Sequence, residues 1–192
     1  MKDDNAVDRI VGERLRTSRK AVDMTLEALA RASDRSIGYI SQIERGLSSP
    51  TIRDVAVFAR VLGVPFVDLL KEPLSAADDT PVRLNADRFA VAFRGSGITK
   101  RILAPRNRGS IECYLMEIDQ GGTTGDEAYA HDGEEAGFVI KGAIDLTIGG
   151  HCYRLSRGDS FRFPSRTAHG FRNASTGPSE VLWVNVGSVR GR

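Results

Sequence analysis

Apolar residues in the first 72 positions recur every three or four residues, the spacing expected of short α-helices with one buried face. Five segments show this pattern, and each opens at a residue that favours the start of a helix: Asp4 or Asn5, Thr25, Ser36, Thr51 and Pro65. Gly46 and Gly63 follow the third and fourth segments and favour helix ends there. The pattern therefore predicts a compact all-α domain of five short helices in residues 1–72.

The pattern changes after residue 82. Residues 73–82 contain two prolines among small and polar residues, which predicts an interdomain linker. Beyond it, short β-type runs alternate with Gly, Asp and Asn, and the predicted strands span residues 89–93, 111–118, 137–140, 143–148, 152–155, 160–163, 168–172 and 181–186. Many short strands of this kind predict an antiparallel barrel or sandwich over residues 83–192. The expected fold class is α+β with two domains.

Composition and charge limit the classes of partner and the cellular compartment that we expect for this protein. The chain has 192 residues, 41% of them hydrophobic, and a net charge of +2. We expect no membrane partner, because no apolar run is long enough to span a bilayer and the charged N-terminus lacks the apolar core of a signal peptide. The two cysteines, Cys113 and Cys152, are far apart and form no CxxC motif, which favours the reducing cytoplasm.

The third predicted helix has two contrasting faces. Ile37, Ile40 and Ile43 share one face and are expected in the core, with Ser36 as the N-cap. The opposite face carries small or hydrogen-bonding residues: Gly38, Ser41, Gln42 and Arg45. Small residues allow close approach to a major groove, and a glutamine there can make a bidentate contact with adenine. This helix is thus a candidate for DNA recognition.

Several motifs in this region resemble the XRE-type, lambda-repressor-like helix-turn-helix family. The match runs from about residue 7 to 71 and includes Thr25-Leu26, Leu29-Ala30, the run from Tyr39 to Gly46, the segment 49–52 and Leu62-Gly63-Val64. The resemblance implies that helix 36–45 is the recognition helix. It also implies the DNA-contacting residues, which are Thr25, Ser36, Gly38, Tyr39, Gln42 and Arg45, with Arg16 a weaker candidate.

The same resemblance also implies structural roles for some residues of this unit. Arg19 and Glu44 match a pair that forms an internal salt bridge, so we assign both to structure. Two roles remain open for Tyr39, which either contacts DNA or covers the edge of the core. Residues 1–72 contain 12 Lys and Arg against 11 Asp and Glu. This balance favours site-specific binding as a dimer over a non-specific coat on DNA. A helix-turn-helix used only for protein contacts is the alternative.

The second half resembles the cupin family, whose fold is a jelly-roll barrel. The resemblance rests on two motifs, residues 125–142 and 158–173. It implies metal-ligand positions at Tyr129, His131, Glu135 and His169. Tyr129 departs from the family, which usually has a histidine at this position. A phenol is a poor metal ligand at neutral pH. Two readings stay open: a divalent transition metal (Zn, Fe, Mn or Ni) held by the other three, or a metal-free pocket for an organic ligand.

A narrower resemblance concerns the sensor half of the putrescine-utilisation repressors, which join this helix-turn-helix to a cupin. It rests on residues 122–125, 131–137 and 142–148 and implies a polyamine or related amine as effector. Such a ligand needs carboxylates at the mouth of a pocket and an apolar wall in its middle for the methylene groups. The candidates for the carboxylates are Glu127, Glu134 and Glu135, and those for the wall are Phe161, Phe163, Phe171 and Trp183. The alternative is that these aromatic residues form ordinary barrel core.

Together these features predict a cytoplasmic, ligand-responsive transcriptional regulator. We expect it to bind a double-stranded operator as a homodimer, to sense a small molecule such as an amine or amino acid, and to repress, because occupancy suffices for repression. The rival is a metal-dependent cupin enzyme, a dioxygenase or an isomerase, that carries a DNA-binding domain. The incomplete ligand set at Tyr129 disfavours the enzyme. A sensor of metal alone is a third reading.

Overall fold

The computed structural model describes residues 4–64, 66–70, 81–82, 84–85, 90–93, 96–104 and 110–187. The chain divides into two compact units, residues 1–73 and 74–192, and each is described by itself. Of the linker predicted at 73–82, only residues 81 and 82 are described, and Pro65 and Phe89 also lie outside the described residues. Within the described residues, no helix is both long and apolar enough to cross a membrane.

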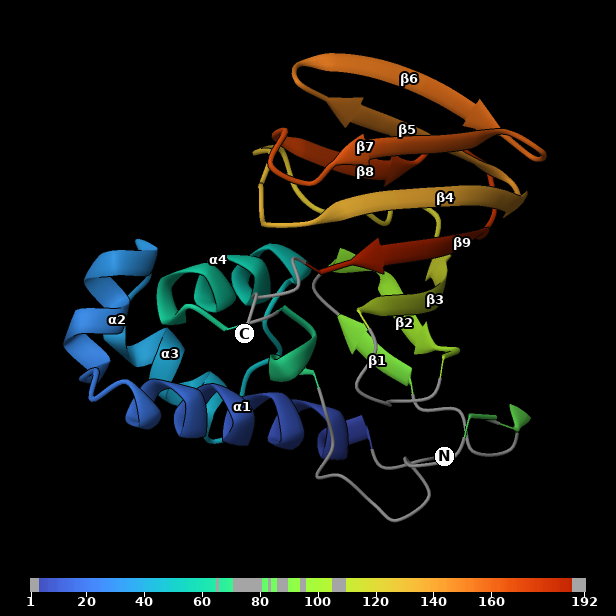
Figure 1. The fold of residues 1–192 in the computed structure, drawn as a ribbon. Coiled ribbons are helices and arrows are strands. Elements are labelled where there is room, and N and C mark those ends of the chain that lie inside the picture. Colours follow the sequence, from blue (N-terminus) through green and yellow to red (C-terminus); the bar gives the residue numbers. More distant parts are fainter. Residues whose placement is uncertain are drawn as a thin grey trace. The chain divides into compact units, whose positions relative to one another are not determined.

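The described residues of the first unit form four α-helices and one 3₁₀ turn, and Figure 1 shows their arrangement. They are α1 (Asp4–Ala21), α2 (Leu26–Ser33), α3 (Ile37–Glu44), α4 (Ile52–Leu62) and η1 (Phe66–Leu69). The predicted count of five α-helices is therefore wrong for the part of the chain that the structure describes. The last segment has only four helical residues, and helical pieces this short commonly take the 3₁₀ form.

Side-chain caps fix where the short helices begin. Thr25 Oγ1 accepts a hydrogen bond from the Ala28 amide, and Ser36 Oγ accepts one from the Tyr39 amide, both at 3.1 Å. Thr51 and Asp54 form a reciprocal capping box at the start of α4. These caps satisfy amides that would otherwise have no partner, so the predicted helix starts at these positions are confirmed.

The core of this unit holds α3 against α1. Ile40 and Ile43 are fully buried, whereas Ile37 is 46% exposed, so the prediction that Ile37 is core is wrong. Residues three apart are rotated by about −60° around a helix, so Ile37 lies about 120° from Ile43 and outside one buried stripe. On α1, Gly12 lies so close to α3 that an added Cβ would be 2.1 Å from the Ile43 carbonyl oxygen.

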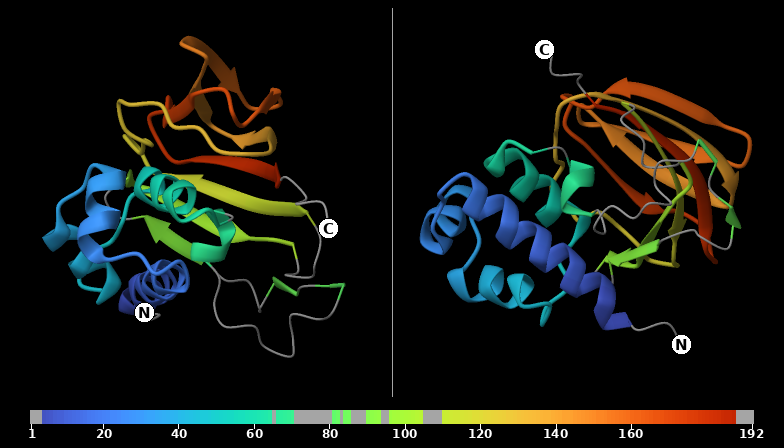
Figure 2. Two further views of the ribbon diagram at one scale, coloured as in Figure 1. Left: turned by 60° about the vertical axis from the view of Figure 1, so that its left-hand side comes forward. Right: turned by 60° about the horizontal axis from the view of Figure 1, so that its bottom comes forward.

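The second unit is built from nine described strands in two antiparallel sheets (Figure 2). One sheet has the order β1-β2-β3-β9-β4-β7 and the other β6-β5-β8. The strands are β1 (Ala90–Phe93), β2 (Ile98–Ile102), β3 (Ile111–Ile118), β4 (Glu134–Lys141), β5 (Ala143–Ile148), β6 (His151–Ser156), β7 (Ser160–Pro164), β8 (His169–Asn173) and β9 (Ser179–Val186). The prediction of an antiparallel β domain agrees with this architecture, but β2 was not foreseen.

Strand register brings inward-facing residues into rows across the large sheet. Asn185 on β9 is paired with Glu112 on β3 and with Glu135 on β4. In the neighbouring row, Trp183 is paired with Tyr114 and Gly137. Because alternate residues of a strand face the same side, these two rows line one interior. An added Cβ at Gly137 would lie 2.3 Å from the Phe161 ring, so a glycine there makes room for the aromatic side chain.

Candidate functional site

In the first unit, the polar face predicted for DNA recognition is open. Ser36, Gly38, Gln42 and Arg45 are all exposed, and nothing lies within 4 Å of an added Cβ at Gly38. The Arg45 guanidinium donates from Nε to the Ser41 carbonyl at 3.2 Å. The backbone of α3 is thus accessible from this side, as a helix in a groove requires.

The internal ion pair predicted between α1 and α3 is confirmed. Arg19 Nε and Nη2 donate to the two oxygens of Glu44 at 2.6 and 2.8 Å. Arg19 Nη1 also donates to the Met24 carbonyl at 2.7 Å. A bidentate pair of this kind fixes geometry as well as energy, and it anchors the C-terminal end of α3.

Tyr39 takes part in a network with the start of α4. Its hydroxyl donates to Asp54 Oδ2 at 2.8 Å, and Arg35 Nε donates to Asp54 Oδ1 at 2.7 Å. The Thr51 amide and hydroxyl also donate to Asp54. Burial and the hydrogen bond to Asp54 raise the pKa of Tyr39, so the phenol stays neutral. This geometry supports a structural role for Tyr39, and its contact with DNA stays a prediction.

Asp54 was not among the candidate residues, although a signal for it exists. The spacing Thr51-x-x-Asp54 is that of a capping box. Of the other predicted DNA contacts, Thr25 is exposed and caps α2, and Arg16 is exposed on α1.

In the second unit, three of the predicted ligand positions meet inside the barrel. One donor atom from each of His131, Glu135 and His169 lies within 4.8 Å of the others. His131 Nε2 is 2.6 Å from Glu135 Oε1, and His169 Nε2 is 3.4 Å from the same oxygen. Glu135 is 2% exposed and His169 is fully buried. The fourth position, Tyr129, joins them, because its ring centroid lies 4.4 Å from that of His169.

Backbone carbonyls define the protonation of both imidazoles. His131 Nδ1 is 3.0 Å from the Asp132 carbonyl and His169 Nδ1 is 2.8 Å from the Thr167 carbonyl. A carbonyl only accepts, so each Nδ1 carries a proton. His131 then has both nitrogens facing acceptors and is best described as an imidazolium. His169 Nε2 is buried and makes no hydrogen bond within the described residues, and Glu135 Oε1 lies 3.4 Å from it.

The electrostatics of the cluster follow from these contacts. Burial alone would raise the pKa of Glu135, but His131 and His169 hold it well below its usual range. Burial lowers the pKa of His131, yet the hydrogen bond and charge of Glu135 leave it raised overall. Burial and the charge of Glu135 raise the pKa of Tyr129, which keeps its phenol protonated. The cluster therefore holds a carboxylate beside an imidazolium and a neutral phenol.

Aromatic residues surround the cluster, an arrangement that fits both the predicted apolar wall and the alternative of ordinary barrel core. The Phe161 ring meets the Trp183 ring edge to face, with centroids 4.7 Å apart, and the Phe171 ring is tilted against it at 4.9 Å. The centroid of the Phe163 ring lies 4.9 Å from that of the His169 ring. Trp183 Nε1 also donates to Glu135 Oε2 at 2.8 Å. This last contact could not be read from the sequence, because it depends on the pairing of β9 with β4.

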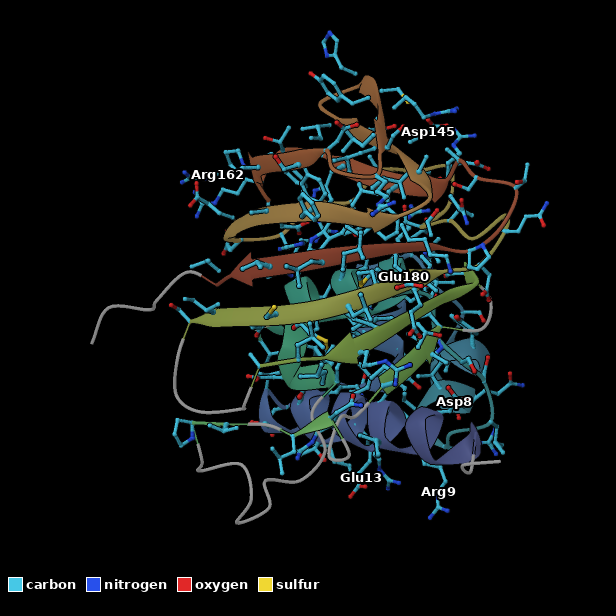
Figure 3. All side chains as sticks on the ribbon, turned by 90° about the vertical axis from the view of Figure 1, so that its right-hand side faces the viewer. Asp8, Arg9, Glu13, Asp145, Arg162 and Glu180 are labelled. Atoms are coloured by element: carbon cyan, nitrogen blue, oxygen red, sulfur yellow. The ribbon has the colours of Figure 1, made fainter. Side chains whose placement is uncertain are left out.

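The other two predicted carboxylates lie outside the buried cluster. Glu134, a candidate for the pocket mouth, faces outward and receives two hydrogen bonds from Arg162, which is labelled in Figure 3. Adjacent strand residues point to opposite faces, so Glu134 cannot share the interior with Glu135. Glu127 is exposed in the segment before Tyr129. His151, expected in a solvated turn, is exposed at the start of β6.

Comparisons with known proteins agree with this architecture. Residues 10–72 match the family described as "Helix-turn-helix domain" and residues 114–185 match "Cupin domain". A solved helix-turn-helix (HTH_3 family) transcriptional regulator from Vibrio cholerae shares the fold, with a TM-score of 0.73 and 22% identity over 96% of this chain and 98% of that one.

Two characterised regulators match along most of the chain. The HTH-type transcriptional regulator PuuR of Escherichia coli is 29% identical over 171 residues, 89% of this chain and 91% of PuuR. The regulator SutR of the same organism is 27% identical over 166 residues, 86% of this chain and 88% of SutR. The chain thus carries a helix-turn-helix domain and a cupin domain and is a homologue of the HTH-type transcriptional regulators PuuR and SutR.

Proposed function

We propose that the helix-turn-helix unit reads a specific operator and that the cupin unit releases it in response to a small molecule. The observation that carries the first part is α3, which buries Ile40 and Ile43 completely while Gly38, Gln42 and Arg45 remain exposed. We assign DNA binding to residues 1–72, a linker to 73–82 and sensing to 83–192. The contacting residues are Thr25, Ser36, Gly38, Gln42 and Arg45, with Tyr39 at the edge of the surface.

Several features of this proposal follow from DNA recognition. A single short recognition helix reads few bases, so the active form is a homodimer on a two-fold operator. Occupancy of the operator then represses transcription. The protein works in the cytoplasm, where its operator is accessible.

Two substitutions separate base recognition from backbone binding. Gln42→Ala should lose about 1–3 kcal/mol of operator affinity with little change on random DNA, because an amide side chain reads a base edge. Arg45→Ala should weaken binding to operator and random DNA alike, because it removes one phosphate contact. The slope of log K against log salt concentration should fall in magnitude by about one. Fluorescence anisotropy with an operator obtained by in vitro selection measures both effects.

Arg60→Ala is the control, because Arg60 is an exposed arginine on α4 of the same unit. It should leave both affinities unchanged. Equal losses on operator and random DNA for Gln42→Ala would remove the assignment of base recognition.

For the sensor, we propose an effector that carries an ammonium group, such as a polyamine, a related amine or an amino acid. Glu135 is the buried carboxylate, Tyr129 and the two histidines offer polar contacts, and Phe163 supplies apolar wall. Glu127 is the candidate at the entrance. Screening amines and amino acids by thermal shift tests this, since a ligand at about 100 times its Kd adds about 2.7 kcal/mol of stability.

The same cluster fits a divalent transition metal. His131 and His169 each donate Nδ1–H to a carbonyl and direct Nε2 inward, which is how metal-binding histidines are usually held. With Glu135 they would hold Zn, Fe, Mn or Ni, and the ion would supply Lewis acidity. We favour the organic effector, because the fourth position is a neutral phenol, which is a poor metal ligand but can hydrogen-bond an organic molecule.

This preference sets the expected metal content. Protein purified without chelator should carry well under one equivalent of transition metal in elemental analysis. A near-stoichiometric content, lost together with the effector response on chelation, would establish the metal sensor instead. Conversion of an added small molecule, seen by mass spectrometry, would establish the rival, a metal-dependent cupin enzyme.

A further inference from the structure

A lysine faces the interior of the cupin unit. On β2, Ile98, Lys100 and Ile102 alternate inward, and Lys100 is only 5% exposed. Its Nζ lies 3.7 Å from the centroid of the Tyr114 ring, a cation–π arrangement. Burial lowers the pKa of Lys100 to about 8, while the charges of Glu112 and Glu135 raise it. The side chain therefore remains mainly an ammonium at neutral pH.

This ammonium shares the interior with two carboxylates. Glu112 on β3 and Glu135 on β4 face inward on either side of β9, and both are engaged: Glu112 accepts a hydrogen bond from the Tyr114 hydroxyl at 2.5 Å, and Glu135 contacts His131 and Trp183. A ligand carboxylate placed at Lys100 would meet an opposite charge at low dielectric, whereas a second ligand ammonium placed there would meet a like charge.

An acceptor in the same interior indicates where a ligand ammonium would go. Asn185 lies between Glu112 and Glu135 in the sheet, and its Oδ1 is buried without a hydrogen-bond partner in the described part of the chain. Buried polar atoms are rarely left unpaired, so this oxygen calls for a donor from a bound molecule or water.

Building on the proposed function, we propose that the cupin interior takes a molecule with both an ammonium and a carboxylate group, and that Lys100 selects for the carboxylate. The ammonium meets Glu135 and Asn185. The carboxylate meets Lys100, whose three N–H donors let it keep its present contacts and still bind a ligand oxygen. The effector class is therefore an amino acid, not a diamine.

Matched compounds test this directly. 1,4-Diaminobutane and 4-aminobutanoate have the same chain of four carbons and one common ammonium, and they differ only in the second charged group. Isothermal titration of the full-length protein should show tighter binding of 4-aminobutanoate by at least about tenfold, the worth of a charge-assisted hydrogen bond. Lys100→Met keeps the apolar stem and should remove or reverse this preference.

Lys141→Met is the matched control, because Lys141 is an exposed lysine on the outer face of β4. It should retain the wild-type preference. Equal or tighter binding of the diamine by the wild type would overturn the inference and leave an amine sensor standing. A preference retained in Lys100→Met would overturn the role of Lys100. Binding of neither compound would count against this inference and the amine sensor together.

Discussion

Glu135→Gln should keep the protein on its operator at effector concentrations that release the wild type. The substitution preserves shape but removes the one carboxylate that contacts His131, His169 and Trp183 together. A charge-assisted hydrogen bond to a ligand ammonium is worth about 1.5–3 kcal/mol, so effector affinity should fall by about 10- to 150-fold. Operator binding without effector depends on the other unit and should not change.

The adjacent residue provides the control. Glu134→Gln removes a carboxylate one position away, but this carboxylate points outward to Arg162 and is exposed. It should leave the effector response intact. Trp183 is the only tryptophan of the chain and donates to Glu135, so its fluorescence reports effector binding independently of DNA. A wild-type response in Glu135→Gln, or an equal loss in Glu134→Gln, would contradict the assigned site.

Gly12→Ala should unfold or severely loosen the DNA-binding unit. Alanine normally favours a helix, but here its Cβ would be 2.1 Å from the Ile43 carbonyl oxygen, so α1 and α3 must separate. Overpacking against a backbone atom costs about 1–3 kcal/mol or more, which is a large share of the stability of a small domain. Urea unfolding followed by circular dichroism at 222 nm should show the loss, and operator affinity should fall with it.

Gly38→Ala tests the same change where there is space. Nothing lies within 4 Å of the added Cβ, so stability should be unchanged or rise by up to about 1 kcal/mol. If Gly12→Ala were as stable as Gly38→Ala, the close packing of α1 on α3 would be wrong. Gly38→Ala should still weaken the operator complex if α3 approaches the groove through this residue.

The fold was largely predictable wherever local signals were strong. Thr25, Ser36 and Thr51 mark helix starts because each side chain caps a backbone amide within three residues. Failures came from tertiary context. Ile37 shares the helical spacing of Ile40 and Ile43 but lies at the edge of the stripe and remains exposed. Strand β2 was not predicted, because Lys100 occupies a buried position between Ile98 and Ile102 and interrupts the alternation of apolar and polar residues.

The candidate ligand site was predictable only in part. Tyr129, His131, Glu135 and His169 were implied by the resemblance to the cupin motifs, and the structure brings all four together. Partners on β2, β3 and β9 could not be predicted, since Lys100, Asn185 and the Trp183 contact depend on strand register. The prediction that Glu134 serves the same pocket as Glu135 failed, because adjacent residues of a strand point to opposite faces of the sheet.

The most direct test is the affinity of the full-length chain for a selected operator, measured by anisotropy with and without saturating effector. The effector used is the amine or amino acid that stabilises the protein most in the thermal-shift screen. Linkage between the two units predicts an operator Kd at least about fivefold higher with effector, and effector binding weakened by the same factor on DNA. Equal operator affinities in the two conditions would contradict the regulator described above.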